Sequence, residues 1–260
     1  MTSTATVLPY DRTAGDGKPS HLVREMSPKT KARVAAVLFL ATIVGGVVAQ
    51  AAIADNLIVT GDATATASNI LANQSLVRIA FMIFMIEMAC QTAMTGMFYD
   101  LMMPVDRSLA RAAAAFGYTG SGIKAMARLF FYAPLFVLGG ASYLSVFDAK
   151  QLEAIAYLMI RLNTVGTQVA VPFLGIGTII TSYLMLRSTF LPRFLGIIGM
   201  SGGAGWVMFW YPPLGSKMFL PIAFTALFGC AVTIGWLLVR GVDENKWHAM
   251  AAHTSRSIWR

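Results

Sequence analysis

Long uninterrupted apolar runs constrain the fold of this chain more than any other feature of its sequence. Two of the clearest, Val34–Ile53 and Met218–Val239, each hold 20 or more residues. A helix of that length reaches across the hydrocarbon core of a bilayer, which is about 30 Å thick. Continuous runs also differ from the ten-residue alternation of a membrane β-barrel. The sequence therefore predicts an all-α, polytopic transmembrane helical bundle and excludes a soluble fold.

The composition agrees with this interpretation. Only 12% of the residues are charged and 57% are hydrophobic, whereas a soluble domain has about 25% charged residues. The net charge of +8 is what a helical membrane protein needs on its cytoplasmic side. No nucleic-acid motif accompanies that charge. We therefore expect membrane lipids as the surroundings of the chain, and no nucleic acid as a partner.

Six predicted spans account for the apolar runs. They cover residues 34–53, 76–103, 109–146, 150–186, 194–213 and 217–240. Lys and Arg gather before the first span, in the second-to-third and fourth-to-fifth connections, and after the sixth span. Lys150 and Lys217 are the basic residues of the other connections. The positive-inside rule then places both termini in the cytoplasm.

The chain divides into three predicted parts. Residues 1–32 are polar and form a flexible cytoplasmic tail, residues 33–241 form the transmembrane domain, and residues 242–260 form a cytoplasmic C-terminal tail. In the first external connection, Asp62 precedes a short helical pattern, so we expect an interfacial helix at about 62–73. The third and fourth spans exceed the membrane thickness, which we attribute to tilt, protrusion and bends at Pro134 and Pro172.

Polar side chains inside the predicted spans form the candidate site. A charge at the centre of a spanning helix costs about 2.5–3.5 kcal/mol on insertion scales, so it is expected to face the bundle interior. By helical rise, Glu87, Arg128 and Arg161 share a depth in the outer half of the membrane. One acid among several bases predicts a net positive pocket. The ligand-binding candidates are Arg78, Glu87, Gln91, Lys124, Arg128, Arg161, Asn163 and Gln168.

Four interpretations of this cluster stay open. Glu87 pairs with Arg128 or Arg161 and only fixes helix register, or a cavity there binds a small anionic or lipid-like ligand. Alternatively, Glu87 is the general acid of an intramembrane enzyme acting on a lipid or isoprenoid. The fourth is a structural subunit that contacts a larger complex through glycine faces such as Gly199 and Gly203. For function we expect the second, non-enzymatic binding or transport, and commit to no catalytic residue.

Missing residue types narrow the chemistry further. The histidines, His21, His248 and His253, all lie in the predicted tails, so histidines between helices cannot hold a metal or haem. The methionines of the second span are spread around the helix and are expected to serve packing. We therefore expect no cofactor and no metal site. A homo-oligomer or a membrane-protein partner stays open.

Several stretches resemble the bacterial integral membrane family known as domain of unknown function 4386. The matching stretches are Gly61–Leu71 with Arg78 after it, Pro104–Ala110, Phe147–Ala156 and Phe190–Gly196. They cover about residues 33–240 in the expected order. The glycine-rich part of the third span, Gly117–Gly122, departs from the apolar run of the family. The resemblance implies a six-helix, multi-pass integral membrane protein of a bacterial inner membrane and assigns no chemistry to it.

Overall fold

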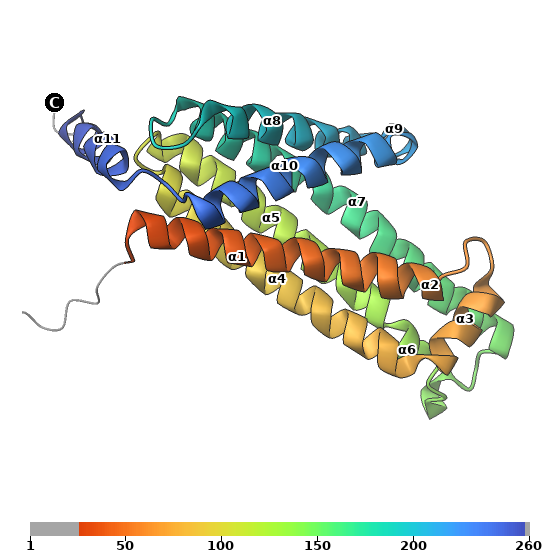
Figure 1. Ribbon diagram of the computed structural model, residues 1–260. Helices are drawn as coiled ribbons and strands as arrows, with labels where there is room; N and C mark the ends of the chain where they lie inside the picture. Colours follow the sequence, from red (N-terminus) through yellow and green to blue (C-terminus); the bar gives the residue numbers. More distant parts are fainter. Residues whose placement is uncertain (1–25, 258–260) are drawn as a thin grey trace, which may run out of the picture.

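Helices make up almost all of the protein (Figure 1). The computed structural model describes residues 26–257, and in that range the chain forms helices and connections but no strand. The long helices are α1 (Pro28–Val47), α4 (Gln74–Met102), α5 (Arg107–Tyr132), α7 (Ala149–Arg187), α8 (Arg193–Val207) and α10 (Phe219–Val239). The shorter ones are η1 (Val48–Ala54), α2 (Asp55–Leu57), α3 (Ala63–Ala72), α6 (Pro134–Val137), η2 (Ser142–Leu144), η3 (Met208–Trp210), α9 (Pro212–Lys217) and α11 (Glu244–Ser257). The all-helical fold class is confirmed for these residues.

The six long helices form a closed ring. Each packs against the next along the chain, from α1 through α4, α5, α7 and α8 to α10, and α10 packs against α1 again. Consecutive members run in opposite directions (Figure 1), as the short connections between them require. We call the end of the ring near α3 and α6 the α3 end, and the opposite end the α11 end.

Four helical segments of the described chain are long and apolar enough to cross a membrane. They are Pro28–Leu57, Gln74–Met102, Ala149–Arg187 and Phe219–Val239. The first runs without a break through α1, η1 and α2. Of the other two ring members, α5 carries charged residues along its length and α8 has only 15 residues. Helices of this length and composition indicate a membrane protein.

The third long helix ends earlier than its apolar run predicts. The span predicted at 109–146 ends as α5 at Tyr132, and the short helix α6 follows. Pro134 lacks a backbone N–H and its ring obstructs the preceding turn, which favours a helix end. Beyond α6, Gly140 has φ of +73°, a left-handed conformation that favours glycine and turns the chain. Pro172, in contrast, lies inside α7, which continues for 39 residues.

The described part of the chain is helical at both of its ends. The first helix begins at Pro28 rather than near residue 34, because the side chain of Ser27 accepts a hydrogen bond from Thr30 N and proline suits the first helical turn. The rest of the predicted N-terminal tail, residues 1–25, lies outside the described residues. In the C-terminal tail, α11 runs from Glu244 to Ser257.

The connection after α1 contains two features that shape the α3 end. The segment η1 is a π-helix, which the sequence analysis does not predict. The second feature is α3, a helix within the range expected from the sequence, with Asp62 accepting a hydrogen bond from Ala65 N. Two bonds join the α3 region to α7: Gly61 N donates to the Tyr157 hydroxyl at 2.7 Å, and Thr64 Oγ1 lies 2.6 Å from a Glu153 carboxylate oxygen.

Two apolar cores occupy the two ends of the ring. The core at the α11 end includes Leu101 and Leu237, and the core at the α3 end includes Phe84 and Ile160. On α4, the two cores are separated by residues 85–93. The corresponding stretches of the other helices also carry few core residues, which leaves space between the two cores.

Candidate functional site

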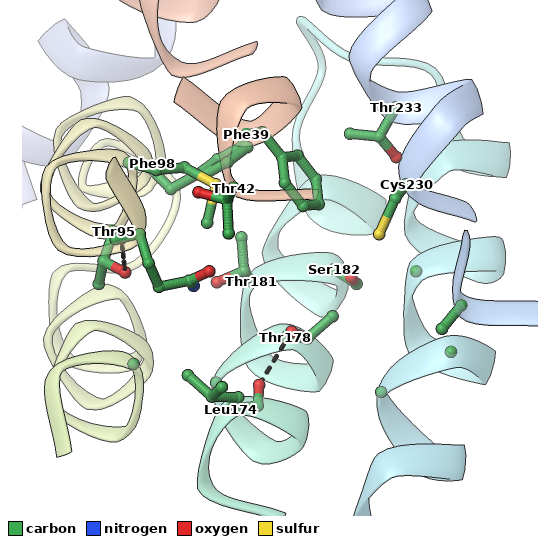
Figure 2. A pocket seen from close by; sticks show the side chains of 18 of the residues that line it. Phe39, Thr42, Thr95, Phe98, Leu174, Thr178, Thr181, Ser182, Cys230 and Thr233 are labelled. Carbon is green, nitrogen blue, oxygen red and sulfur yellow. Dashed lines mark hydrogen bonds between the residues drawn. The ribbon is translucent and has the colours of Figure 1, made fainter. Parts of the chain in front are cut away.

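A cavity of about 350 Å³ lies inside the ring of helices. All six long helices contribute to its wall, and most of the wall is apolar. Figure 2 shows Thr42, Thr95, Thr178, Thr181 and Ser182 gathered around this space. Thr178 lies inside α7, faces this interior space and is still exposed. The ring therefore encloses a hollow interior rather than a packed centre.

Three threonine hydroxyl groups of the cavity wall donate their hydrogens to the backbone, so their oxygens remain available as acceptors. Thr42, Thr95 and Thr178 each donate to the backbone carbonyl four residues earlier, at 2.8–2.9 Å. A hydroxyl has one hydrogen and two lone pairs, so each oxygen keeps the capacity to accept another hydrogen bond. The middle of the cavity is therefore apolar with scattered acceptor oxygens.

An ion pair between neighbouring helices forms the polar part of the wall. Lys124 of α5 donates to Glu87 Oε1 of α4 at 2.5 Å, and both residues line the cavity. The Glu87 side chain is only 3% exposed, and its Oε2 has no hydrogen-bond partner in the described structure. Gly46 of α1 makes room for this carboxylate, because a Cβ there would lie 3.1 Å from Oε1. One acid and one base therefore face the cavity together.

A second buried cation lies one helical turn further along α5, outside the cavity wall. Arg128 is 3% exposed and donates to Asn163 Oδ1 at 3.2 Å and to Gln50 Oε1 at 3.4 Å. Its guanidinium carbon lies 3.6 Å from the centroid of the Phe84 ring, a cation–π arrangement. Gln50 belongs to η1, so the π-helical segment carries one of the two amides. Arg128 thus closes a polar layer between the cavity and the α3 end.

The structure brings together some of the sequence candidates and separates others. Glu87, Gln91 and Lys124 line the cavity, while Arg128 and Asn163 form the adjoining layer. The remaining candidates lie elsewhere: Arg78 and Arg161 are exposed, and Gln168 is half-buried away from the cavity wall.

The expected pairing of Glu87 with Arg128 or Arg161 is therefore corrected to Lys124. The physical reason is that α4 and α5 are neighbours in the ring, and α5 turns Lys124 toward Glu87 while α7 presents Arg161 on its exposed side. The expected net positive pocket is corrected as well, because the charges that line the cavity balance.

Sequence reasoning missed residues that complete these layers. Gln50 is a lone amide in an apolar run, a signal that was visible because buried amides require partners. Gly46 and Phe84 gave no such signal, since glycine and phenylalanine are common in apolar helices. The hydroxyl residues of the wall also gave none, because a helix can satisfy them internally.

The glycines singled out in the fifth span are used inside the chain. A Cβ at Gly203 would lie 2.8 Å from the Gly175 carbonyl oxygen of α7, and one at Gly199 would collide with Ser182 Oγ. These glycines let α7 and α8 approach closely. Their contacts are therefore with this chain's own helices.

Comparison with known proteins identifies the family of the chain but assigns no activity to it. In residues 26–257, no three His, Cys, Asp or Glu side chains are placed to hold a metal ion. No curated protein and no solved structure matches the chain. The family model described as domain of unknown function (DUF4386) matches residues 34–241, which include most of α1 and all of the other five helices of the ring. The chain therefore belongs to this family of unknown function.

Proposed function

We propose that all six helices of the ring cross a bacterial inner membrane, with the α3 end outside and both termini in the cytoplasm. Support comes from α5 and α8, which complete the ring between helices that are apolar enough to span. The charged residues in the middle of α5, Lys124 and Arg128, are not on its exposed side. Uncharged residues such as Tyr118, Met126 and Leu129 are exposed there instead. The distribution of Lys and Arg sets the orientation.

We propose further that the central cavity binds a small lipid-like molecule without covalent chemistry, for storage, sensing or transport. The single observation that carries this proposal is one largely apolar cavity that every helix of the ring lines. Its volume of about 350 Å³ falls in the range of small-molecule sites, about 300–1,000 Å³. A water-soluble anion is less well matched, because the cation at the wall already has its counter-charge.

The seam between α1 and α10 is the entrance that fits such a ligand. Val47 of α1 and Leu227 of α10 both line the cavity, and they are 49% and 43% exposed. These two helices meet near the α11 end and diverge toward the α3 end (Figure 1). A chain-like molecule could then pass from the hydrocarbon phase into the cavity without crossing the polar layer of Arg128.

Native mass spectrometry of the gently extracted protein tests the proposal. Thr178→Phe places a ring inside the cavity, whereas Val169→Phe places the same ring on the exposed side of the same helix, where Val169 is 48% exposed. We expect a discrete added mass on the wild type and on Val169→Phe, and its loss from Thr178→Phe. Equal added mass on all three proteins would overturn the cavity as the binding site.

A further inference from the structure

We propose that the ligand of the cavity presents an uncharged hydroxyl group to Glu87 and Lys124, as a long-chain alcohol would. The inference rests on the proposed function and names the headgroup class of that same site. It is independent of the entrance, because it concerns only the polar part of the wall.

Charge balance is the first argument. Glu87 and Lys124 form a pair whose charges cancel, and among residues 26–257 no other charged side chain lines the cavity. An anionic headgroup next to Lys124 would also approach the buried carboxylate of Glu87, and an ammonium headgroup would approach Lys124. Either would leave an uncompensated charge in a site of low dielectric, which costs far more than placing a neutral polar group there. The pair therefore selects against both charged classes.

Hydrogen-bonding capacity is the second argument. An ammonium group has three donors, and Lys124 gives one of them to Glu87 Oε1. A headgroup oxygen can accept another. Acceptors are also present, because Gln91 lines the cavity one turn from Glu87, and the oxygens of Thr42 and Thr95 keep free lone pairs. A hydroxyl both donates and accepts, so it suits this wall better than a group with only one of these capacities.

The apolar remainder of the wall supplies the place for a chain. Phe39, Phe98 and Met94 line the cavity on the side of the α11 core, and Leu174 and Val171 line it from α7. Burial of apolar surface there stabilises a hydrocarbon chain by about 25 cal/mol per Å². The headgroup and the chain are then accommodated in one continuous space.

The test compares four 18-carbon compounds that differ only at the head: oleyl alcohol, oleate, oleylamine and cis-9-octadecene. Each is added at equal mole fraction to nanodiscs that contain the full-length protein, and bound masses are counted by native mass spectrometry. We expect wild type to bind oleyl alcohol at least about 10-fold more tightly than each of the other three. That ratio corresponds to about 1.4 kcal/mol. Equal or tighter binding of oleate or oleylamine overturns the headgroup inference.

A double variant supplies the control. Glu87→Gln with Lys124→Met removes both charges together and so leaves no unpaired charge to disrupt folding. We expect its preference for oleyl alcohol over cis-9-octadecene to fall to less than about threefold, and retention of the full preference overturns the inference. If wild type binds none of the four, or if Thr178→Phe leaves binding unchanged, the proposed function itself fails. If Thr178→Phe abolishes binding but wild type binds all four compounds equally well, only the inference of a hydroxyl headgroup is overturned.

Discussion

At the scale of single residues, the protein accommodates its buried charges in two different ways. Lys124 is neutralised by a carboxylate, whereas Arg128 is held by two amide oxygens and an aromatic face. The first arrangement lines the cavity and the second does not. A neutral pair at the wall and a fixed cation behind it together make the cavity polar at one side without giving it a net charge.

A double-mutant cycle on Glu87 and Lys124 should show strong coupling. Removing one partner leaves a buried unpaired charge, so Glu87→Gln and Lys124→Met should each lower the free energy of unfolding by about 3–5 kcal/mol. The double variant should lose less than the sum of the two. Chemical unfolding in a mild detergent measures these values. The half-exposed pair Lys31–Asp100 is the matched control, with coupling of no more than about 1 kcal/mol. Additive losses at Glu87 and Lys124 would contradict the pairing.

At the scale of helices, α11 is tied to the start of α1. Glu244 Oε1 accepts a hydrogen bond from Lys29 N at 3.2 Å, where the first turn of α1 has unpaired N–H groups. Hydrogen bonds from the Ser27 side chain and the Lys29 backbone hold the pKa of Glu244 below its ordinary value. Trp247 Nε1 adds a bond to the Leu101 carbonyl oxygen at 3.0 Å. The C-terminal helix is therefore attached partly through one carboxylate, that of Glu244, and partly through Trp247.

Acid should loosen α11 before it affects the ring. Because the folded pKa of Glu244 is lowered, its contribution to stability is present above the ordinary value of 4.5 and is lost as the pH falls through the folded value. Hydrogen exchange of the α11 amides, corrected for intrinsic rates, should therefore show falling protection below about pH 4.5. Glu244→Gln should show weakened protection already at neutral pH. Protection of α11 that is the same in both proteins at every pH would refute this attachment.

The boundaries of the helices show what the sequence could and could not predict. Apolar runs and the distribution of Lys and Arg predict the order of the six helices, because hydrophobic length is a local property. They do not predict that Pro134 ends a helix while Pro172 lies inside one. A proline leaves the backbone carbonyl one turn earlier without its N–H donor, and whether the helix continues depends on whether neighbouring helices cover that carbonyl. The π-helix η1 was not predicted either; it contains Gln50, whose partner Arg128 lies on a distant helix that the local sequence does not reveal.

The sequence identified polar residues of the candidate site but not which of them pair with each other. Glu87 could be recognised because an acid inside an apolar helix needs a counter-charge. Choosing Lys124 over Arg128 requires the rotation of α5 about its axis, and the two residues differ by only one turn. A cavity at this cluster was one of the interpretations of the sequence, but its largely apolar wall was not predicted, because that wall depends on six helices closing a ring.

At the scale of the whole molecule, the closed ring makes a prediction about topology. Ser145 lies in the connection at the α3 end and Asn245 at the α11 end, and both are exposed. The test uses two variants, each with a single cysteine at one of these positions. These cysteines would be introduced after Cys90 and Cys230 are replaced by alanine. In intact spheroplasts, a membrane-impermeant maleimide should label only the cysteine at 145, and lysis should allow labelling at 245. Labelling of both before lysis would contradict the three crossings, by α7, α8 and α10, that the proposal places between these two positions.

Photolabelling tests the central claim, that a lipid-like chain occupies the interior of the ring. Oleyl alcohol with a diazirine in the middle of its chain is added to wild type, Thr178→Phe and Val169→Phe in nanodiscs, and adducts are mapped by peptide mass spectrometry. Wild type and Val169→Phe should carry adducts at interior residues such as Met94 and Cys230, which line the cavity, and Thr178→Phe should lose them. Phe224, in contrast, faces outward and is 76% exposed. If adducts in all three proteins lie only on such outward residues, the claim is contradicted.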